Sequence, residues 1–410
     1  MHIDESNAGE LLGPLSTDPL QPSSIDVGRA MQEGRRRRAR RTAVTSGVAG
    51  LTVLAMAGVP VAITSMQKTD NSTLVEASAS AAPPATAAPS ASPPVTAAPS
   101  ASSPPPKAPP VPTSCKAERL PIPDNVTMAL VTAADPTGRT IFGRSYPQPG
   151  TNQVILWRDG KATKIDVPGD AQAINSVNAG GTAVGESTVD GKPVAWLFSD
   201  GKVTRLPGGD GATAEGINAG NVIVGSRNRR PLIWRTPASD PVELPLPDGA
   251  SNGEAHAIDD DGTAVGTITT GTGSVAYAWA ADGTGRILPT VGDPGNLGYT
   301  AFTVRNGWAT GVSTATGLRW NLRTGQVEAV PGINIRPSTA NTSGWMVGTD
   351  MQGRGVLIAA GRTLVLPDVF VHRPGGFSNL PKTISDDGRV LAGQADDTDH
   401  VIHAVVWRCS

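Results

Sequence analysis

The stretch EGINAGNVIVGSRNRRPLIWR, residues Glu215–Arg235, contains the unit from which most of this chain is built. A short apolar run leads to an Asn turn, a second run ends in Gly, and a third ends in Trp. Seven copies of this unit lie between Met128 and Cys409. Their anchoring glycines stand about 37 to 45 residues apart, at Gly143, Gly185, Gly225, Gly266, Gly311, Gly348 and Gly393. Short β-like runs at this period predict an all-β fold, a seven-bladed β-propeller.

Each repeat predicts four strands, called A to D in chain order. Asn or Asp stands seven residues before the anchoring Gly in several repeats, as at Asn178, and another Gly follows three residues later, as at Gly181. Asn bonds its own backbone and Gly accepts positive φ, so this pair predicts the A–B turn. Asp200-Gly201 predicts a C–D hairpin turn. We expect the anchoring glycines to lie where strands crowd near the propeller axis.

A regular aromatic stripe marks the end of strand C. It consists of Trp157, Trp196, Trp234, Trp279, Trp320 and Trp407, with Ile358 in the sixth repeat. Such a stripe is typical of packing between blades. Trp308 and Trp345 fall outside it, where they either form an exposed aromatic patch or pack in strand B.

The last repeat ends at Cys409-Ser410 without a strand D. The missing text appears at the other end of the domain, where Lys116–Pro121 matches the strand D of Lys202–Pro207. We therefore predict that the N-terminal strand closes the last blade. Cys115 and Cys409 then stand where other blades have the C–D turn, so a disulfide between them is expected, and it would persist outside the cytoplasm.

The repeats resemble those of the HAF-repeat family of extracellular bacterial proteins, whose unit runs Ala, two residues, Ile-Asn, two residues, Gly, x-Val-Gly. Ala214–Gly225, Ala255–Gly266 and Thr339–Gly348 match best, and the similarity covers roughly residues 128–408. Repeats one, five and seven depart from it; the fifth has Arg305-Asn306 in place of Ile-Asn. The resemblance implies a secreted or surface propeller of unknown activity and carries no catalytic residues to transfer. The layout of basic tract, anchor and Ala/Pro-rich linker ahead of the repeats looks actinobacterial.

The N-terminal part predicts a membrane anchor. Residues 1–41 form a polar tail that ends in a basic tract, and residues 42–67 contain no charged side chain. Twenty-six helical residues span ~39 Å, enough for a ~30 Å hydrocarbon core. The arginines place the tail in the cytoplasm and the C-terminal domain outside. A cleaved Sec signal or a twin-arginine signal are the alternatives.

Residues 68–113 predict a linker, because the tract from 76 onward is almost entirely Ala, Ser, Pro and Thr. This composition favours an extended polyproline chain with a reach of up to ~100 Å. The propeller is then residues 114–410, held away from the plasma membrane as the extracellular part of a single-pass protein.

Composition and motifs exclude several functions. The net charge of −2 argues against nucleic acid as a partner. The chain contains no sequence motif of a zinc metalloprotease, of a serine-hydrolase nucleophile elbow or of a phosphate-binding loop. Asp259–Asp261 and Asp386-Asp387 lie in A–B turns and lack the spacing of calcium loops. No catalytic residue, cofactor or assigned metal is expected.

The longest B–C and D–A loops lie on one face of the propeller, in neighbouring blades six, seven and one. They are 144–153, 367–380 and 395–401, and long loops on a rigid scaffold are where binding resides. The hypothesis is a recognition surface, with a cation held by the three loop aspartates as an added possibility. Its residues are Tyr146, Phe370, His372, Arg373, Phe377, Asp396, Asp397, Asp399 and His400.

The sequence therefore favours a membrane-anchored extracellular module that binds or scaffolds a protein, glycan or cell-wall ligand. Two alternatives stay open. One is a carbohydrate-active lyase or hydrolase that uses acidic residues of the loop face. The other is a sensor that couples binding outside the cell to the cytoplasmic tail.

Overall fold

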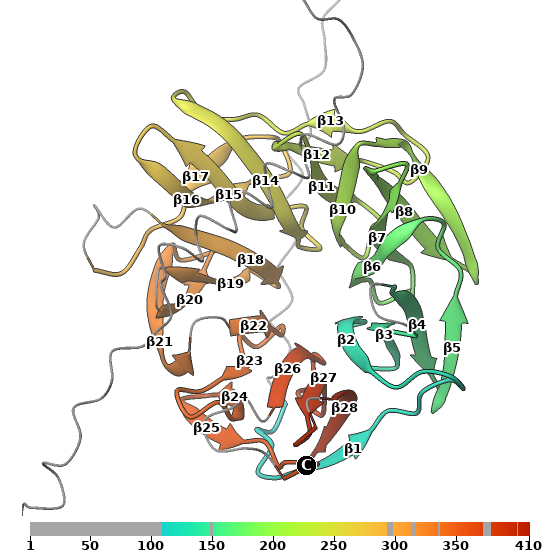
Figure 1. Cartoon of the computed structure of the whole chain (residues 1–410). Helices are drawn as coiled ribbons and strands as arrows, with labels where there is room; N and C mark the ends of the chain where they lie inside the picture. Colours follow the sequence, from blue (N-terminus) through green and yellow to red (C-terminus); the bar gives the residue numbers. More distant parts are fainter. Residues whose placement is uncertain are drawn as a thin grey trace, which may run out of the picture. The chain divides into compact units, whose positions relative to one another are not determined.

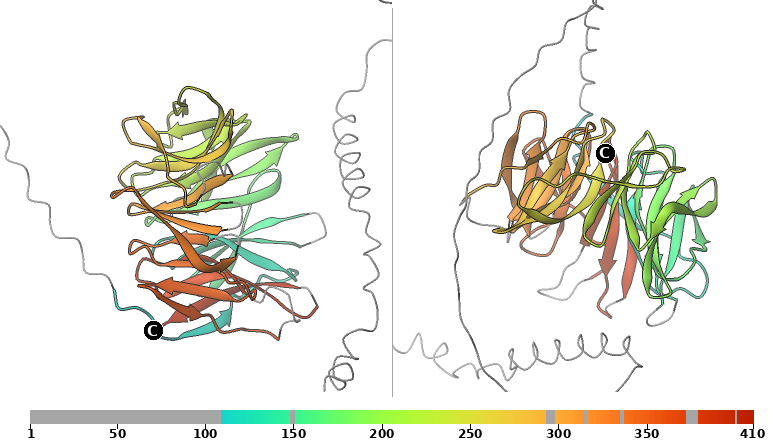
Figure 2. Two further views of the ribbon diagram at one scale, coloured as in Figure 1. Left: turned by 90° about the vertical axis from the view of Figure 1, so that its left-hand side faces the viewer. Right: turned by 90° about the horizontal axis from the view of Figure 1, so that it is seen from above.

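The computed structural model describes residues 109–147, 151–292, 298–313, 316–334, 337–371, 379–399 and 401–410. These residues form seven four-stranded antiparallel sheets arranged around an axis, so the all-β, seven-bladed propeller is confirmed (Figure 1). Figure 2 shows the same blades from the side. The tail, the anchor at 42–67 and nearly all of the linker lie outside the described residues. In the described part, no helix is long and apolar enough to cross a membrane.

The blades follow one another along the chain, and each runs from strand A at the axis to strand D at the rim (Figure 1). The A strands are β2 (Ala129–Ala134), β6 (Asp170–Val177), β10 (Ala212–Ile217), β14 (Ala250–Ile258), β18 (Tyr299–Arg305), β22 (Pro337–Ala340) and β26 (Asn379–Ile384). The B strands are β3 (Thr140–Ser145), β7 (Ala183–Val189), β11 (Ile223–Arg227), β15 (Ala264–Thr270), β19 (Trp308–Ser313), β23 (Met346–Thr349) and β27 (Val390–Asp396).

The outer half of each blade consists of strands C and D. The C strands are β4 (Gln153–Arg158), β8 (Lys192–Ser199), β12 (Arg230–Trp234), β16 (Gly273–Trp279), β20 (Thr316–Asn321), β24 (Gly355–Ala359) and β28 (Ile402–Cys409). The D strands of blades one to six are β5 (Lys161–Ile165), β9 (Lys202–Asp210), β13 (Val242–Glu243), β17 (Gly285–Ile287), β21 (Gln326–Asn334) and β25 (Arg362–Val365).

The seventh blade takes its strand D from the start of the domain. Strand β1 (Cys115–Arg119) pairs antiparallel with β28, with Cys115 opposite Cys409. The two sulfur atoms form a disulfide that joins residues 294 positions apart in sequence. Both the shared last blade and the disulfide are therefore confirmed, and they place the C-terminus beside β1 (Figure 1).

The tryptophan stripe joins each blade to the one before it. Trp234 is fully buried, and its Nε1 donates a hydrogen bond to the carbonyl oxygen of Pro207, which ends the apolar part of the preceding strand D (2.8 Å). Four more indoles bond in the same way to a proline carbonyl of the preceding blade: those of Trp157, Trp279, Trp320 and Trp407. The predicted packing between blades is confirmed for these five residues.

Trp196 does not belong to the stripe. It pairs with the anchoring Gly185 itself, whereas stripe residues pair two positions before that glycine, so Phe198 fills the stripe in blade two. Phe198 packs edge-on against Phe142 of blade one, with ring centroids 5.2 Å apart. The alternation along strand C predicted the correct face of the blade for Trp196. On that face, however, the stripe position belongs to Phe198, two residues further along the strand.

Trp308 and Trp345 do not form an exposed patch. Trp345 is buried, and Trp308 is half-buried beneath the guanidinium of Arg319, 5.0 Å from its ring centroid. They pack in and beside strand B, which was the second of the two expectations.

Candidate binding site in the central channel

A β-bulge in strand A places one residue of each blade towards the axis. In blade three the pairing of β10 with β11 shifts between Ala214 and Gly216, which leaves Glu215 as the extra residue. A Cβ on the opposing Gly225 would overlap the carbonyl oxygen of Thr213, so only glycine fits opposite the bulge. The same overlap with a strand A carbonyl exists at Gly143, Gly185, Gly266, Gly311 and Gly393.

This arrangement gives the expected crowding a specific cause. The backbone that leaves no room for a side chain at these glycines belongs to the bulged strand A of the same blade, which is the strand nearest the axis. The glycine therefore marks the position of the bulge, and through it the residue that faces the channel.

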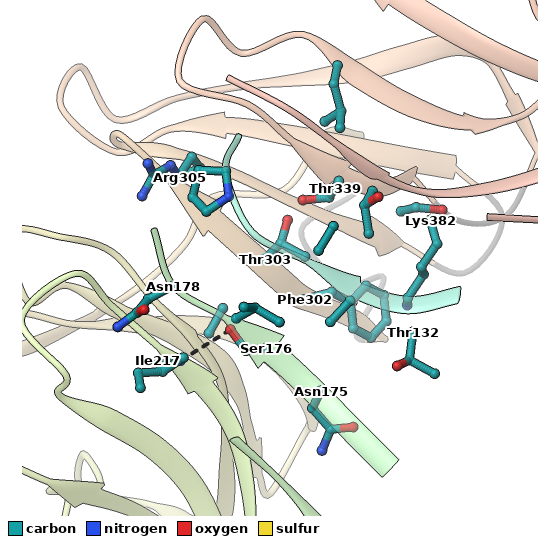
Figure 3. Close-up of a pocket in the computed structure, with 18 of the residues that line it drawn as sticks. Thr132, Asn175, Ser176, Asn178, Ile217, Phe302, Thr303, Arg305, Thr339 and Lys382 are labelled. Carbon is teal, nitrogen blue, oxygen red and sulfur yellow. Dashed lines mark hydrogen bonds between the residues drawn. The ribbon is translucent and has the colours of Figure 1, made fainter. Parts of the chain in front are cut away.

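The seven bulge residues line one cavity of about 580 Å³ (Figure 3). They are Thr132, Asn175, Glu215, His256, Phe302, Ser338 and Lys382. Arg144 and Gln394, each directly after an anchoring glycine, also line it. Each blade contributes a different side chain at the same position, so the repeat produces a ring of seven chemically different groups around the channel.

Burial and neighbouring charges shift the pKa values of the carboxyl groups in and beside the channel. Burial is the main cause that raises the pKa of Glu215 to about 7; the neighbouring Glu186 and Glu254 add to the rise, while a hydrogen bond from Thr213 and the charge of Lys382 oppose it. Burial also raises the pKa of Glu186, against a hydrogen bond from Asn175 and the charge of Arg144. A carboxyl that titrates near neutral pH is a group of the kind found at functional sites.

The A–B turns line one end of the channel and are joined by contacts between blades. The side-chain amide of Asn178 donates to the carbonyl oxygen of Asn218 (3.1 Å), and that of Asn218 donates to the carbonyl oxygen of Asp259 (3.0 Å). Asn341 repeats the contact with Ser385 (3.2 Å). In addition to starting its own turn, each of these residues therefore ties its blade to the next.

The predicted loop surface is only partly assembled in the described residues. Phe370 and Asp397 meet at His403, whose ring stacks on Phe370 with centroids 4.4 Å apart. His403 Nε2 lies 2.8 Å from the Asp397 carboxylate, and Nδ1 lies 2.8 Å from Nη2 of Arg119. The guanidinium of Arg119 also sits over Phe370, 5.3 Å from the ring centroid.

This cluster is a packed structural unit rather than a reactive pair. A guanidinium only donates, so Nδ1 of His403 accepts and Nε2–H donates to Asp397. That hydrogen bond is the main cause that lowers the pKa of Asp397. With both ring nitrogens engaged, His403 has no free nitrogen with which to act as a base. Sequence reasoning missed Arg119 and His403, although the match of Lys116–Pro121 to a strand D already placed Arg119 in the last blade.

The loop aspartates and Tyr146 take part in local hydrogen bonds. Asp396 accepts a hydrogen bond from Gln394 (3.1 Å), Asp397 accepts the backbone N–H of Asp399 (2.9 Å), and the backbone N–H of Tyr146 is bonded to Met128. Among the described residues, no group of three acidic, His or Cys side chains is placed so as to hold a metal ion. Four predicted residues lie outside the described part: His372, Arg373, Phe377 and His400.

The fold and the channel define this molecule as a disulfide-closed, seven-bladed β-propeller with a polar axial cavity. No family model and no curated protein sequence matches the chain. Among solved structures it is similar to a catalytically inactive virginiamycin B lyase from Staphylococcus aureus with quinupristin. That structure has 14% identity and a TM-score of 0.51, with 72% of this chain and 99% of that chain covered.

Two further structures are similar at lower TM-scores. A puromycin-hydrolyzing peptidase from Mycobacterium tuberculosis has 15% identity and a TM-score of 0.47, covering 73% of this chain and 55% of that chain. A gluconolactonase from Xanthomonas campestris has 12% identity and a TM-score of 0.40, covering 72% and 90%. These two similarities carry no argument, and at 14% identity the similarity to the lyase shows the fold alone.

Proposed function

We propose that this protein is an extracellular binding module of the HAF-repeat type, held at the plasma membrane by residues 42–67 and presented on the linker at 68–113. The ligand is a glycan, a cell-wall component or a protein. The observation that carries the proposal is the cavity of about 580 Å³ into which every blade delivers one side chain. Its size is that of small-ligand and cofactor pockets, which a few placed polar groups make specific.

The disulfide supports the location outside the cytoplasm. It joins the first and last strands of the propeller, and such bonds persist in oxidising compartments. Fractionation of cells, followed by protease treatment of intact cells, tests the placement. We expect the full-length chain in the membrane fraction, with the propeller accessible from outside. A chain recovered in the cytoplasm with reduced cysteines would contradict it.

A binding screen tests the function. The purified full-length chain is applied to glycan arrays, cell-wall fragments and candidate proteins, in parallel with the double variant Glu215→Gln/Lys382→Gln, which changes the channel. A second double variant, Arg119→Gln/Asp397→Asn, changes the loop face. A ligand bound by the wild type and lost with the channel variant supports the proposal. Loss with the loop variant alone would move the site to the loop face.

An enzyme is the second candidate, because Glu215 titrates near neutral pH beside Glu186. A general acid or base works best with a pKa near the working pH. The test is to incubate bound polysaccharides with wild type and with Glu215→Gln and to analyse the products. Turnover that disappears in the variant favours the enzyme, and unchanged ligand recovered after binding favours the binding module. The sensor role stays a prediction, which a pull-down with residues 1–34 would test.

A further inference from the structure

Lys382 and Glu215 place an amine and a carboxyl group on opposite sides of the central channel. Lys382 belongs to blade seven and Glu215 to blade three, and three blades is the largest separation that a ring of seven allows. Arg144 of blade one adds a second cation in the blade next to that of Lys382, and its charge also acts on Glu186 of blade two. A ligand that crosses the channel from blade seven to blade three therefore meets Lys382 at one end and Glu215 at the other.

Arg144 is half-buried in the wall of the same cavity. Its Nε is buried and has no hydrogen-bond partner within the described residues. A buried donor of this kind has lost its hydrogen bonds to water without a replacement, which leaves the guanidinium poorly solvated. An anionic group in the channel would stabilise the charge of Arg144, without contact to the buried Nε itself.

Between Lys382 and Glu215 the cavity is also lined by aromatic and hydroxyl-bearing side chains. The ring of Phe302 projects into the cavity together with Thr132 and Thr303 (Figure 3). The ring of His256 lies beside Phe302, with centroids 6.1 Å apart. These side chains offer both apolar contact and hydroxyl groups to the body of a ligand that reaches from one charged side to the other.

We propose that the channel binds a small zwitterion of the amino-acid or short-peptide class, with its ammonium group towards Glu215 and its carboxylate towards Arg144 and Lys382. This inference rests on the proposed binding function and specifies the ligand. A simple anion would face Glu215 without a partner, and a simple amine would make no use of the cations at Arg144 and Lys382. A zwitterion satisfies both sides at once.

The first test uses the wild-type full-length chain, so it does not depend on a variant that folds. Isothermal titration calorimetry compares trialanine with N-acetyl-trialanine, which lacks the ammonium group, and with trialanine amide, which lacks the carboxylate. Trialanine is expected to bind, and each blocked peptide is expected to bind about 10- to 100-fold more weakly, the size of one lost charge-assisted hydrogen bond.

Variants then assign each charge to its side. Glu215→Gln should weaken trialanine but should not weaken N-acetyl-trialanine further, because that peptide has already lost the interacting group. Lys382→Gln should behave in the same way with trialanine amide. The matched controls Glu243→Gln and Lys202→Gln change exposed residues of D strands at the rim and should leave the affinity for trialanine unchanged.

Three results would overturn the inference: no binding of trialanine at millimolar concentration, equal binding of the three peptides, or no effect of the channel variants on trialanine. In any of these cases, a chain that still binds a glycan or protein in the screen retains the proposed function. A chain that binds nothing in either experiment loses both.

Discussion

Arg305 of blade five reaches past blade six and places its Nη2 2.7 Å from the carboxylate of Asp386 in blade seven. Its Nε lies 3.3 Å from the other oxygen of the same carboxylate, and its Nη1 lies 2.7 Å from Asp260 of blade four. Repeat five is one of those that depart from the Ile-Asn unit, and Arg305 stands where the unit has Ile. Blade five still bonds to blade six through the side-chain amide of Asn306, which donates to the carbonyl oxygen of Thr342 (2.9 Å), while Arg305 in addition connects three A–B turns at the end of the channel.

Replacing Arg305 should therefore destabilise the ring more than the loss of a surface ion pair would. Only 23% of the Arg305 side chain is exposed, and Arg305→Gln leaves the carboxylates of Asp260 and Asp386 without their shared cation. We expect the free energy of unfolding to fall by about 2 kcal/mol. Denaturant titration followed by tryptophan fluorescence measures it. The control is Arg205→Gln, whose ion pair with Asp210 is exposed; it should cost less than about 1 kcal/mol. Equal losses in the two variants would contradict the bridge.

The anchoring glycine should not tolerate a methyl group. In Gly225→Ala the new Cβ would overlap the carbonyl oxygen of Thr213, so the bulge or the strand pairing has to shift. Overpacking of this kind costs about 1 to 3 kcal/mol. The matched control is Gly271→Ala in the B–C turn of blade four, where a Cβ meets nothing within 4 Å. Thermal unfolding should separate the two variants clearly, and a Gly225→Ala protein as stable as the control would show that the bulge does not require glycine.

The disulfide should contribute a large part of the stability of the closed ring. Without it, β1 is held to β28 only by strand pairing, and the ring can open at one place. The chain-entropy model gives about 5 to 6 kcal/mol for a loop of this length, and native disulfides typically contribute about 2 to 5 kcal/mol. We expect Cys115→Ser/Cys409→Ser to lose an amount in this range in denaturant titration. Wild type treated with a reductant is the control, because it should match the variant. No difference between oxidised and reduced wild type would contradict a stabilising role.

Much of this architecture is readable in the sequence because it depends on local signals. The isolated strand D at Lys116–Pro121 is similar in sequence to other D strands. Cys115 and Cys409 flank the position of the missing C–D turn. Periodicity cannot decide between two aromatic residues on the same face of one strand. Trp196 and Phe198 both lie on the same face of β8, so alternation alone does not say which of them belongs to the stripe. The stripe could be placed only when the pairing with Gly185 was known.

The channel residues could not be recognised in this way, although a signal for them exists. The residue at the bulge position differs in type from repeat to repeat, as Thr132, Phe302 and Lys382 show. Comparison of the repeats therefore does not identify this position as functional. Once the anchoring glycine is understood as the partner of a bulge, the residue three positions before the A–B turn residue is identified as the one facing the axis. The loop residues have no repeat at all, and their contacts with His403 depend on tertiary packing.

Glu215 should make the stability of the propeller depend on pH. Its pKa is raised from the ordinary 4.5 to about 7 in the folded protein, mainly by burial, so the folded state holds the proton to higher pH than the unfolded state does. Between these two values the folded state binds more protons, and the free energy of unfolding falls as the pH rises; above about 7 this group adds no further change. Glu215→Gln removes this titration.

We therefore expect Glu215→Gln to be more stable than wild type at pH 8 and to have a flatter profile between about pH 4.5 and 7. Some slope should remain, because the pKa of Glu186 is raised as well. Denaturant titrations at several pH values measure the profile, with Glu243→Gln on the exposed strand β13 as the control that should follow the wild type. A variant profile parallel to that of wild type would show that Glu215 is already ionised in the folded channel. In that case Glu215 would meet a ligand as a carboxylate and not as a protonated carboxyl group.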